Sequence, residues 1–415
     1  MRRRGWLIYA SDREAAIRGI REASLASPGS LTACFSPVEI DGIGDFFRVR
    51  STIHPPADLA ACRVAYPGVD WQVHGDLPRP PASLTLPSPR DGEGDVEVLS
   101  LLGRFPTWVE CRGARQRDFL AAAGITHGWT HARDYDGVSA EIERRRPRVV
   151  LNEVWTVSLA DHALLARRWP AVQFVALSHA VPGWIATERP AEHYAFLTLA
   201  RERPNCHYGT VMPADRVVAP RGTRIVSLPN FATMPEGLPA REDGPPTVSL
   251  IARDTECKQW GAAVAAVAVA ARSIPDLHVV VGSPKLRGGI VPHLRYLDEL
   301  GVPHVSLDWS TWGGYIDRVA RSVDCHLTAT IAESFCLIPL EHCLLGRPVA
   351  GTPAVEWLPP KWQRNPQDPA ALAGCLVSHF REYDAAAGKA RAIAERVAAK
   401  NHRQLLASLR SLIDA

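Results

Sequence analysis

One stretch of the sequence reads Glu333-Ser-Phe-Cys-Leu-Ile-Pro-Leu-Glu341, with two carboxylates separated by seven residues. The residues just before it, 325–329, have the composition of a short buried strand. Pro339 suits an early position in a helix, where its missing backbone N–H costs nothing. The stretch therefore predicts a strand, a turn that carries Glu333, and a helix that carries Glu341.

This strand–turn–helix unit indicates a ligand site. In an open parallel sheet, ligands bind outside the carboxyl ends of the strands, where Glu333 is expected to lie. The turn also exposes backbone N–H groups at a helix N-terminus, which attract anions. The alternative, that Glu333 and Glu341 are ordinary helix-terminal and surface acids, stays open at this point.

Two further expected strand ends carry residues suited to an anion. The strand at 247–252 is followed by Arg253 and Lys258, five residues apart. Arginine offers a planar fork and lysine a mobile point charge, so the pair suits a diphosphate. The strand at 278–281 ends at Gly282, which permits a close backbone turn. A cation pair, a glycine and a carboxylate at three strand ends together indicate one site.

Strand-like and helix-like segments alternate on both sides of a proline-rich segment at about 229–246, which is typical of two α/β domains joined by a linker. In the first half, short apolar runs predict strands at 5–10, 148–151 and 172–177. We expect domains at 1–228 and 229–390, followed by a helix at 391–415.

Taken in order, five segments of the second half resemble the motifs of family-4 glycosyltransferases, which have the GT-B fold. They are Pro229-Asn-Phe231, Arg253 to Lys258 with Gly261, the strand that ends in Gly282, the stretch 333–341, and Gly346-Arg-Pro-Val349. The ordered set is specific and covers about 229–370. The resemblance implies two Rossmann-like domains that face a cleft, with the helix 391–415 crossing back to the first domain.

The resemblance further implies that the second domain binds a nucleoside-diphosphate sugar, in the first place a UDP-sugar. Arg253 and Lys258 would hold the diphosphate, and Glu333 would contact the sugar hydroxyls. Glu341 would accept hydrogen bonds from the ribose hydroxyls. The donor-binding residues implied are Arg253, Lys258, Gly282, Glu333, Ser334, Phe335, Cys336, Leu337 and Glu341.

The first half matches the family more loosely and, by resemblance, would bind the acceptor. His179 stands where the family has a histidine near the reacting sugar, although a packed or surface histidine remains the alternative. The acceptor-side residues implied are His179, Asn152, Glu153, Ser11 and Asp12, and the catalytic residues are Arg253, Lys258, His179 and Glu333.

The sequence departs from the family in both halves. Ser334 and Cys336 stand where the family has glycines, and a side chain at Cys336 would narrow the range of sugars that fit. The Gly-Gly loop of the family, expected after the first strand, reads Ala10-Ser-Asp-Arg13 here.

The implied reaction transfers a hexose from the nucleotide sugar to an acceptor with retention of anomeric configuration. Negative charge grows on the departing diphosphate, so preorganised cations and a helix N-terminus lower the barrier where that charge develops. Neither a metal nor a tightly bound cofactor is expected. Asp134 and Asp136 lie away from the donor motifs, and no His/Cys cluster has metal-ligand spacing.

The acceptor stays open between a saccharide, a lipid, a small molecule and a DNA base. A DNA glycosyltransferase acting on a hydroxymethylated pyrimidine is one alternative, because the first half is rich in residues that contact phosphates and stack on bases. These are Arg2, Arg3, Arg4, Arg112, Arg115, Arg117, Arg144, Arg145, Arg146, Arg148, Trp71, Trp108, Trp129 and Trp155. A further alternative is a protein that binds sugar nucleotides without transferring sugar.

Composition sets outer limits on the function. The chain of 415 residues is 46% hydrophobic and 22% charged, which excludes disorder as its main state. Its nine cysteines form no Cys-x-x-Cys pair, which favours free thiols over a disulfide scaffold or a zinc site. A net charge of +3 permits an anionic partner without requiring one.

Length and polarity patterns bear on location. The longest apolar stretch, 260–271, is shorter than the roughly 20 residues of a membrane span. The apolar run behind the basic residues 1–4 is too short for a secretory signal. We therefore expect a cytoplasmic protein without a transmembrane segment. Residues 78–95 are expected to form a long loop. No sequence pattern indicates the oligomeric state.

Overall fold

The computed structural model describes residues 6–9, 37–40, 43–49, 72–74, 95–103, 109–179, 190–252, 256–282, 291–307, 312–333 and 335–415, and every structural statement below concerns these ranges. Several residues singled out above lie outside them: Arg2, Arg3, Arg4, Ser11, Asp12, Trp71, Trp108, Arg253, Ser334 and nearly all of 78–95. The chain divides into two compact units, Met1–Thr85 with Leu286–Pro292, and Leu86–Lys285 with His293–Ala415.

The smaller unit contains a four-stranded antiparallel sheet. Its strands are β1 (Trp6–Tyr9), β2 (Pro37–Ile40), β3 (Ile43–Val49) and β4 (Gln72–His74), in the order β2-β3-β1-β4. The strand expected at 5–10 is present as β1, but it pairs antiparallel with β3 and β4 and does not begin a parallel sheet. A short apolar run does not distinguish the two kinds of strand, which explains the wrong expectation.

The first sheet of the larger unit is parallel and six-stranded. It consists of β5 (Val98–Leu101), β6 (His127–Thr130), β7 (Val149–Glu153), β8 (Gln173–Ser178), β9 (Cys206–Thr210) and β10 (Ile225–Ser227), in the order β10-β9-β8-β7-β5-β6. The strands expected at 148–151 and 172–177 are confirmed as β7 and β8. The strand order reverses between β5 and β7, so the loops after these strands diverge to opposite faces of the sheet.

The helices of this domain are the π-helix η1 (Val109–Arg115), α4 (Gln116–Ala122), α5 (Tyr135–Arg145), α6 (Leu159–Arg168) and α8 (Pro190–Glu202). Side chains that precede two of them fix where they begin. Asp134 accepts a 2.8 Å hydrogen bond from the backbone N–H of Gly137, and Ser158 accepts one of 3.1 Å from that of Asp161. These are N-caps, which satisfy donors that a helix leaves without partners.

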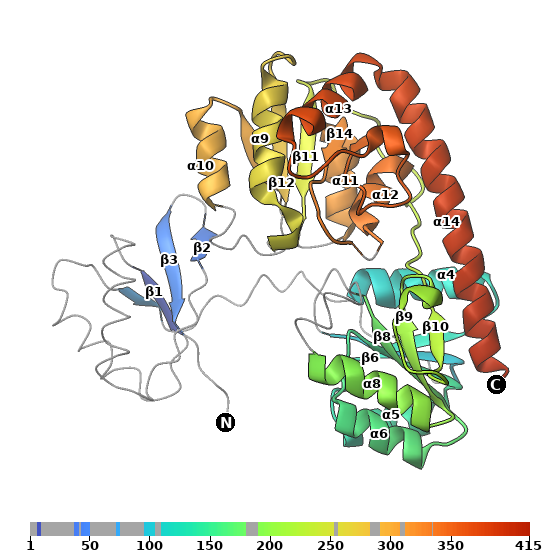
Figure 1. Ribbon diagram of the computed structural model, residues 1–415. Helices are drawn as coiled ribbons and strands as arrows, with labels where there is room; N and C mark the ends of the chain where they lie inside the picture. Colours follow the sequence, from blue (N-terminus) through green and yellow to red (C-terminus); the bar gives the residue numbers. More distant parts are fainter. Residues whose placement is uncertain are drawn as a thin grey trace. The chain divides into compact units, whose positions relative to one another are not determined.

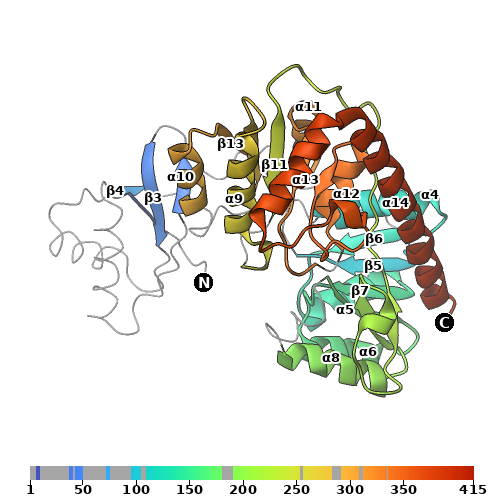
Figure 2. The same ribbon diagram turned by 45° about the horizontal axis from the view of Figure 1, so that its top comes forward.

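The second sheet of the larger unit is also parallel. It consists of β11 (Thr247–Ile251), β12 (His278–Gly282), β13 (His304–Leu307), β14 (Cys325–Leu327) and β15 (Val349–Ala350), in the order β13-β12-β11-β14-β15. Its helices are α9 (Trp260–Ala271), α10 (Val291–Glu299), α11 (Trp312–Ser322), α12 (Leu337–Leu344) and α13 (Pro369–Arg381), and α9 packs against α13 (Figure 2). Residues 229–246, which join the two sheets, contain no helix or strand. This arrangement is a Rossmann-like, doubly wound sheet.

The last helix, α14 (Tyr383–Ile413), runs from the second sheet's helices to the first sheet (Figure 1). Its final turns place Leu405, Leu409 and Leu412 in one buried cluster with Val98 and Leu151 of β5 and β7. The expected helix that crosses back is therefore confirmed. Among the described residues, none of the helices has both the length and the apolar composition that a membrane span requires.

Candidate active site

The second sheet reverses its strand order between β11 and β14, and the loops that follow these two strands form the candidate site. They are held together by backbone and side-chain contacts. The backbone N–H of Ile331 donates to the carbonyl of Cys257 at 2.8 Å, and the hydroxyl of Thr330 donates to the same carbonyl at 3.2 Å. Ligands bind at such switch points, so these loops are the candidate binding site.

An ion pair between Lys258 and Glu333 spans these loops. Lys258 ends the short helix η3 (Glu256–Lys258) after β11, and its Nζ donates to Oε1 of Glu333 after β14. The two side chains are only 14% and 10% exposed. A partly desolvated ion pair of this kind is strongly disturbed when one partner is lost, because the remaining charge stays unpaired.

Glu341 lies in α12 and is 2% exposed. Its Oε1 accepts a 2.6 Å hydrogen bond from the indole Nε1 of Trp312. Burial raises the pKa of Glu341 to about 7, although the hydrogen bond from Trp312 and the charge of Arg115 act in the opposite direction. A carboxyl group that titrates near neutrality is therefore present beside the switch point.

Arg115 reaches this acid from the domain of the first sheet. Its guanidinium lies 3.2 Å from the centre of the Trp312 ring and donates a 2.7 Å hydrogen bond to the hydroxyl of Thr233. The sequence patterns marked Arg115 only as one member of an arginine-rich segment, and they gave no indication of Trp312. Their contact joins residues that are distant along the chain, which no local pattern reveals.

The remaining donor-side residues have structural explanations. At Gly282, which ends β12, a Cβ would lie 3.2–3.3 Å from the side chains of Ile251 and Leu307, so a side chain there would make these neighbours shift slightly. Cys336 precedes α12 with φ 58° and ψ 74°, in the left-handed region that favours glycine. Burial raises the pKa of its thiol to about 11. The carbonyl of Phe335 accepts a 2.8 Å hydrogen bond from Trp357, and Leu337 begins α12.

A second polar group lies at the ends of β7 and β8 in the first sheet. Oε2 of Glu153 lies 2.7 Å from Nε2 of His179, and Arg112 Nη2 donates to Oε1 of Glu153 at 3.0 Å. Burial alone would raise the pKa of the fully buried Glu153, but Arg112 and His179 more than offset burial and lower it to about 2. The structure thus brings together His179 and Glu153, and it adds Arg112 to them.

Asn152 does not join this group. Its amide Nδ2 donates to the carbonyl of Val157 at 3.0 Å, and its Oδ1 accepts from the N–H of Val157 at 2.9 Å. These bonds close the loop in which Val154 and Trp155 have φ values of 52° and 54°. Asn152 therefore stabilises an unusual loop conformation, and its role on the acceptor side stays a prediction.

Several of the described arginines in the first half are engaged with protein groups. Arg112 is buried against Glu153, Arg145 is buried beside Glu141, and Arg146 pairs with Asp95. The side chains of Trp129 and Trp155 are buried as well, which leaves neither free to stack on a base. Among the described residues, Arg112, Trp129 and Trp155 are therefore not exposed to a nucleic acid.

Within the described ranges, no group of three or more His, Cys, Asp or Glu side chains is arranged so that it could hold a metal ion. Asp134, of the expected Asp134–Asp136 pair, is the N-cap of α5. The six cysteines with described side chains are free thiols: Cys206, Cys257, Cys325, Cys336, Cys343 and Cys375.

Comparison with known proteins identifies the fold. No protein-family model and no curated protein matches the sequence. HepE from Anabaena, solved with UDP and glucose, is 14% identical, and the match covers 76% of this chain and all of HepE with a TM-score of 0.55. The galactosyltransferase WaaB of the lipopolysaccharide outer core is 12% identical over 77% of this chain and 99% of its own, with a TM-score of 0.52. Sucrose-phosphate synthase from Thermosynechococcus elongatus is 14% identical over 76% and 96%, with a TM-score of 0.51. The two Rossmann-like sheets and the long terminal helix are those of the GT-B glycosyltransferase fold.

Proposed function

We propose that the protein transfers a hexose from a nucleoside-diphosphate sugar, in the first place a UDP-sugar, to an acceptor with retention of anomeric configuration. In this proposal residues 229–390 bind the donor and residues 1–228 bind the acceptor. The observation that carries it is the Lys258–Glu333 pair at the switch point of the second sheet. HepE, which has the same fold, was solved with UDP and glucose, and this supports the choice of donor.

The Lys258–Glu333 pair suits a donor that carries both a diphosphate and a sugar. A diphosphate presents oxygens with more negative charge than one carboxylate, so it competes well for Lys258. Once its ion pair with Lys258 is broken, Glu333 can accept hydrogen bonds from the hydroxyls of the sugar. Arg253, five residues before Lys258, is proposed to share the diphosphate. Both roles use charges that the loops after β11 and β14 already hold close together.

The chemical step needs charge stabilisation more than a protein nucleophile. The bond from the anomeric carbon to the phosphate oxygen breaks, the bond to the acceptor oxygen forms on the same face, and the acceptor proton passes to the departing phosphate. Lys258 and the N-terminus of α12 stabilise the charge that grows on the diphosphate. Loss of one such charged contact costs about 2–4 kcal/mol, or roughly 10²–10³ in rate.

His179 is proposed to contact the reacting sugar from the acceptor side. Glu153 accepts from its Nε2, which fixes the orientation of the imidazole, and Arg112 keeps Glu153 ionised. Such a buried chain of groups holds a side chain in one geometry before the substrate arrives. His179 is therefore the catalytic residue of this group, and Glu153 and Arg112 are positioning residues.

The test combines ligand binding with turnover. Thermal unfolding of the wild type is measured with UDP, GDP, ADP and their glucose conjugates, since a ligand of the folded state raises the melting temperature. Lys258→Ala is expected to lose the shift, and Lys400→Ala, an exposed lysine of α14, is expected to keep it. Release of free nucleotide, and the anomeric configuration of the product by NMR, then test transfer with retention.

Three outcomes would count against the proposal. If no nucleotide shifts the melting temperature, the donor site is wrong. If a nucleotide binds but neither sugar transfer nor slow donor hydrolysis occurs with any acceptor, the protein binds sugar nucleotides without transferring sugar. A product with inverted configuration would reject the retaining mechanism alone.

A further inference from the structure

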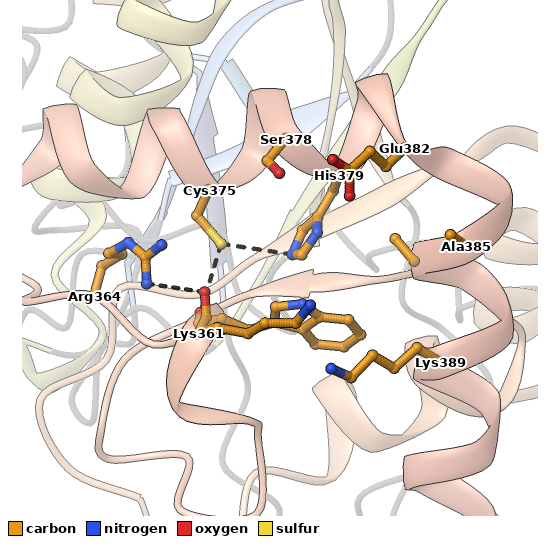
Figure 3. Close-up of a pocket in the computed structure, with 10 residues that line it drawn as sticks. Lys361, Arg364, Cys375, Ser378, His379, Glu382, Ala385 and Lys389 are labelled. Carbon is orange, nitrogen blue, oxygen red and sulfur yellow. Dashed lines mark hydrogen bonds between the residues drawn. The ribbon is translucent and has the colours of Figure 1, made fainter.

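The second domain carries a pocket of about 170 Å³ that the proposed function does not use. Its wall is formed by η4 (Pro360–Trp362), the residues that follow it, α13 and the first turns of α14 (Figure 3). Lys361, Glu382 and Lys389 are exposed, so the pocket opens to solvent. A water molecule has a share of about 30 Å³ in the liquid, so the space accommodates a small polyatomic anion with some of its water.

Three cations line this pocket against one acid. Lys361, Arg364 and Lys389 are positively charged, and Glu382 is the acid. None of the three cations forms an ion pair with an acidic side chain anywhere in the part of the chain that the structure describes. His379 adds no charge near pH 7, because burial lowers its pKa to about 4. The pocket therefore has a net positive charge with no protein counterion in contact.

The two lysines come from different elements, and their amino ends approach one another (Figure 3). The proximity of the Lys361 ammonium group lowers the pKa of Lys389. Nζ of Lys389 also lies 5.8 Å from the centre of the ring of Trp362, another residue that lines the pocket, and this cation–π contact helps to hold the lysine in place. Two like charges this close repel each other, and an anion bound between them would offset this repulsion because it attracts both lysines.

We propose that this pocket binds a phosphate group, either free or carried by a small organic molecule. The phosphate oxygens would bridge Lys361 and Lys389, and the guanidinium of Arg364 would add a third positive charge. The backbone N–H of Arg364 donates to the carbonyl of Gly351 at 2.8 Å, which ties this segment to the end of β15. A bound phosphate would thus link the β15 edge of the sheet to α14.

The experiment titrates the purified chain with inorganic phosphate, and separately with glycerol 3-phosphate, while unfolding is followed. Chloride at equal ionic strength is the reference, because general screening acts with either salt. The wild type is expected to gain about 2–4 °C in melting temperature in a saturable way. A doubly substituted variant, Lys361→Gln with Lys389→Gln, is expected to lose that gain. Its melting temperature without phosphate is expected to exceed that of the wild type, because the repulsion is gone.

Two further variants separate this site from the donor site and from general charge effects. Lys258→Ala is expected to keep the shift with phosphate, since the pocket does not include Lys258. Lys400→Gln, which removes one exposed charge from the same helix, is expected to keep it too. Equal phosphate shifts in the wild type and the double variant, or no shift with either phosphate compound, would overturn the proposal. Loss of the shift in Lys258→Ala alone would overturn it as well.

Discussion

The indole Nε1 of Trp312 donates a 2.6 Å hydrogen bond to Oε1 of Glu341, and the guanidinium of Arg115 lies 3.2 Å from the centre of the same indole ring. Trp312 therefore contacts both a cation from the domain of the first sheet and an acid from the domain of the second. The carboxylate proposed for the ribose is oriented by the fold before a nucleotide arrives. Preorganisation of this kind lowers the cost of ordering a site when its ligand binds.

Glu341→Gln is expected to stabilise the unliganded protein above neutral pH. The pKa of Glu341 is raised from 4.5 to about 7, so the folded state holds a proton that the unfolded state releases between these values. The stability that this group contributes is complete below pH 4.5 and is lost as pH rises through 7. The neutral amide avoids that loss, and urea unfolding at pH 8 should show a gain of about 1–3 kcal/mol.

The same variant is expected to bind nucleotide more weakly. Loss of the charged acceptor should raise the dissociation constant of UDP by roughly 10–100-fold, as measured by calorimetry. The gain in stability should vanish at pH 4.5, where the wild-type carboxyl is protonated in the folded state. A gain of the same size at both pH values would contradict the account of burial, and unchanged UDP affinity would contradict the ribose role.

Arg115→Ala is expected to lower the free energy of unfolding by about 1–2 kcal/mol, because it removes the cation over Trp312 and the hydrogen bond to Thr233. It also removes a positive charge that favours ionised Glu341, so the pKa of Glu341 should rise further. The pH at which UDP binding falls to half should then move upward. Arg396→Ala is the matched control, since Arg396 is an exposed arginine of α14. That control should change stability by less than about 0.5 kcal/mol, and an equal effect of both variants would reject the special role of Arg115.

Glu153→Gln is expected to be strongly destabilising, by about 3–5 kcal/mol, because Arg112 would keep a buried charge without its partner. The lowered pKa of Glu153 gives the sign of the pH effect. Its stabilisation is present above pH 4.5 and is lost as pH falls toward 2, so the wild type should lose more stability in that range than the variant. His179→Asn serves as the comparison, since it leaves the pair of Arg112 and Glu153 intact.

Activity separates the two variants of this group. His179→Asn should lower kcat with a small change in stability, whereas Glu153→Gln should lower both, because His179 loses its orienting partner. The double variant should be no slower than His179→Asn alone if Glu153 acts through His179. Additive losses in kcat would show that Glu153 acts on the substrate by another route.

The second sheet could be predicted from sequence because its signals are local. Apolar runs such as that of β12 are typical of strands covered on both faces, and each ends close to a polar or glycine residue that marks the strand end. Glu333 and Lys258 could be placed at strand ends in this way, one by one. Their ion pair could not be predicted, because the two residues are 75 positions apart in the chain. They meet only because β11 and β14 are neighbours in the sheet.

The first sheet was harder to predict because its opening strand is short and weakly marked. β5 consists of Val98–Leu101 and follows a proline- and glycine-rich stretch, so its pattern does not stand out from a loop. His179 and Glu153 were each placed at a strand end, but their contact depends on β7 and β8 being neighbours. Arg115 and Trp312 meet across two domains, and only the packing of the folded chain brings them together.

Cys336→Gly is expected to leave stability unchanged or raise it by up to about 1 kcal/mol, although most glycine substitutions destabilise. Cys336 has φ 58°, a conformation that costs a side-chain-bearing residue about 1–2 kcal/mol and costs glycine almost nothing. The greater conformational entropy of glycine in the unfolded chain reduces this gain in stability by about 0.4–1 kcal/mol. Cys343→Gly is the matched control: Cys343 is fully buried within α12, which Cys336 only precedes, and this variant should lose about 2–3 kcal/mol of stability.

The same substitution tests the role of Cys336 beside the proposed donor. Its thiol lies close enough to Lys258 for the lysine charge to lower the thiol pKa against the larger effect of burial. Removal of the side chain should therefore enlarge the space next to the diphosphate and sugar. We expect Cys336→Gly to bind a wider set of nucleotide sugars than the wild type, in thermal shift or calorimetry, with unchanged affinity for the free nucleotide. If affinity for free nucleotide falls instead, the side chain supports the diphosphate site and does not limit the sugar.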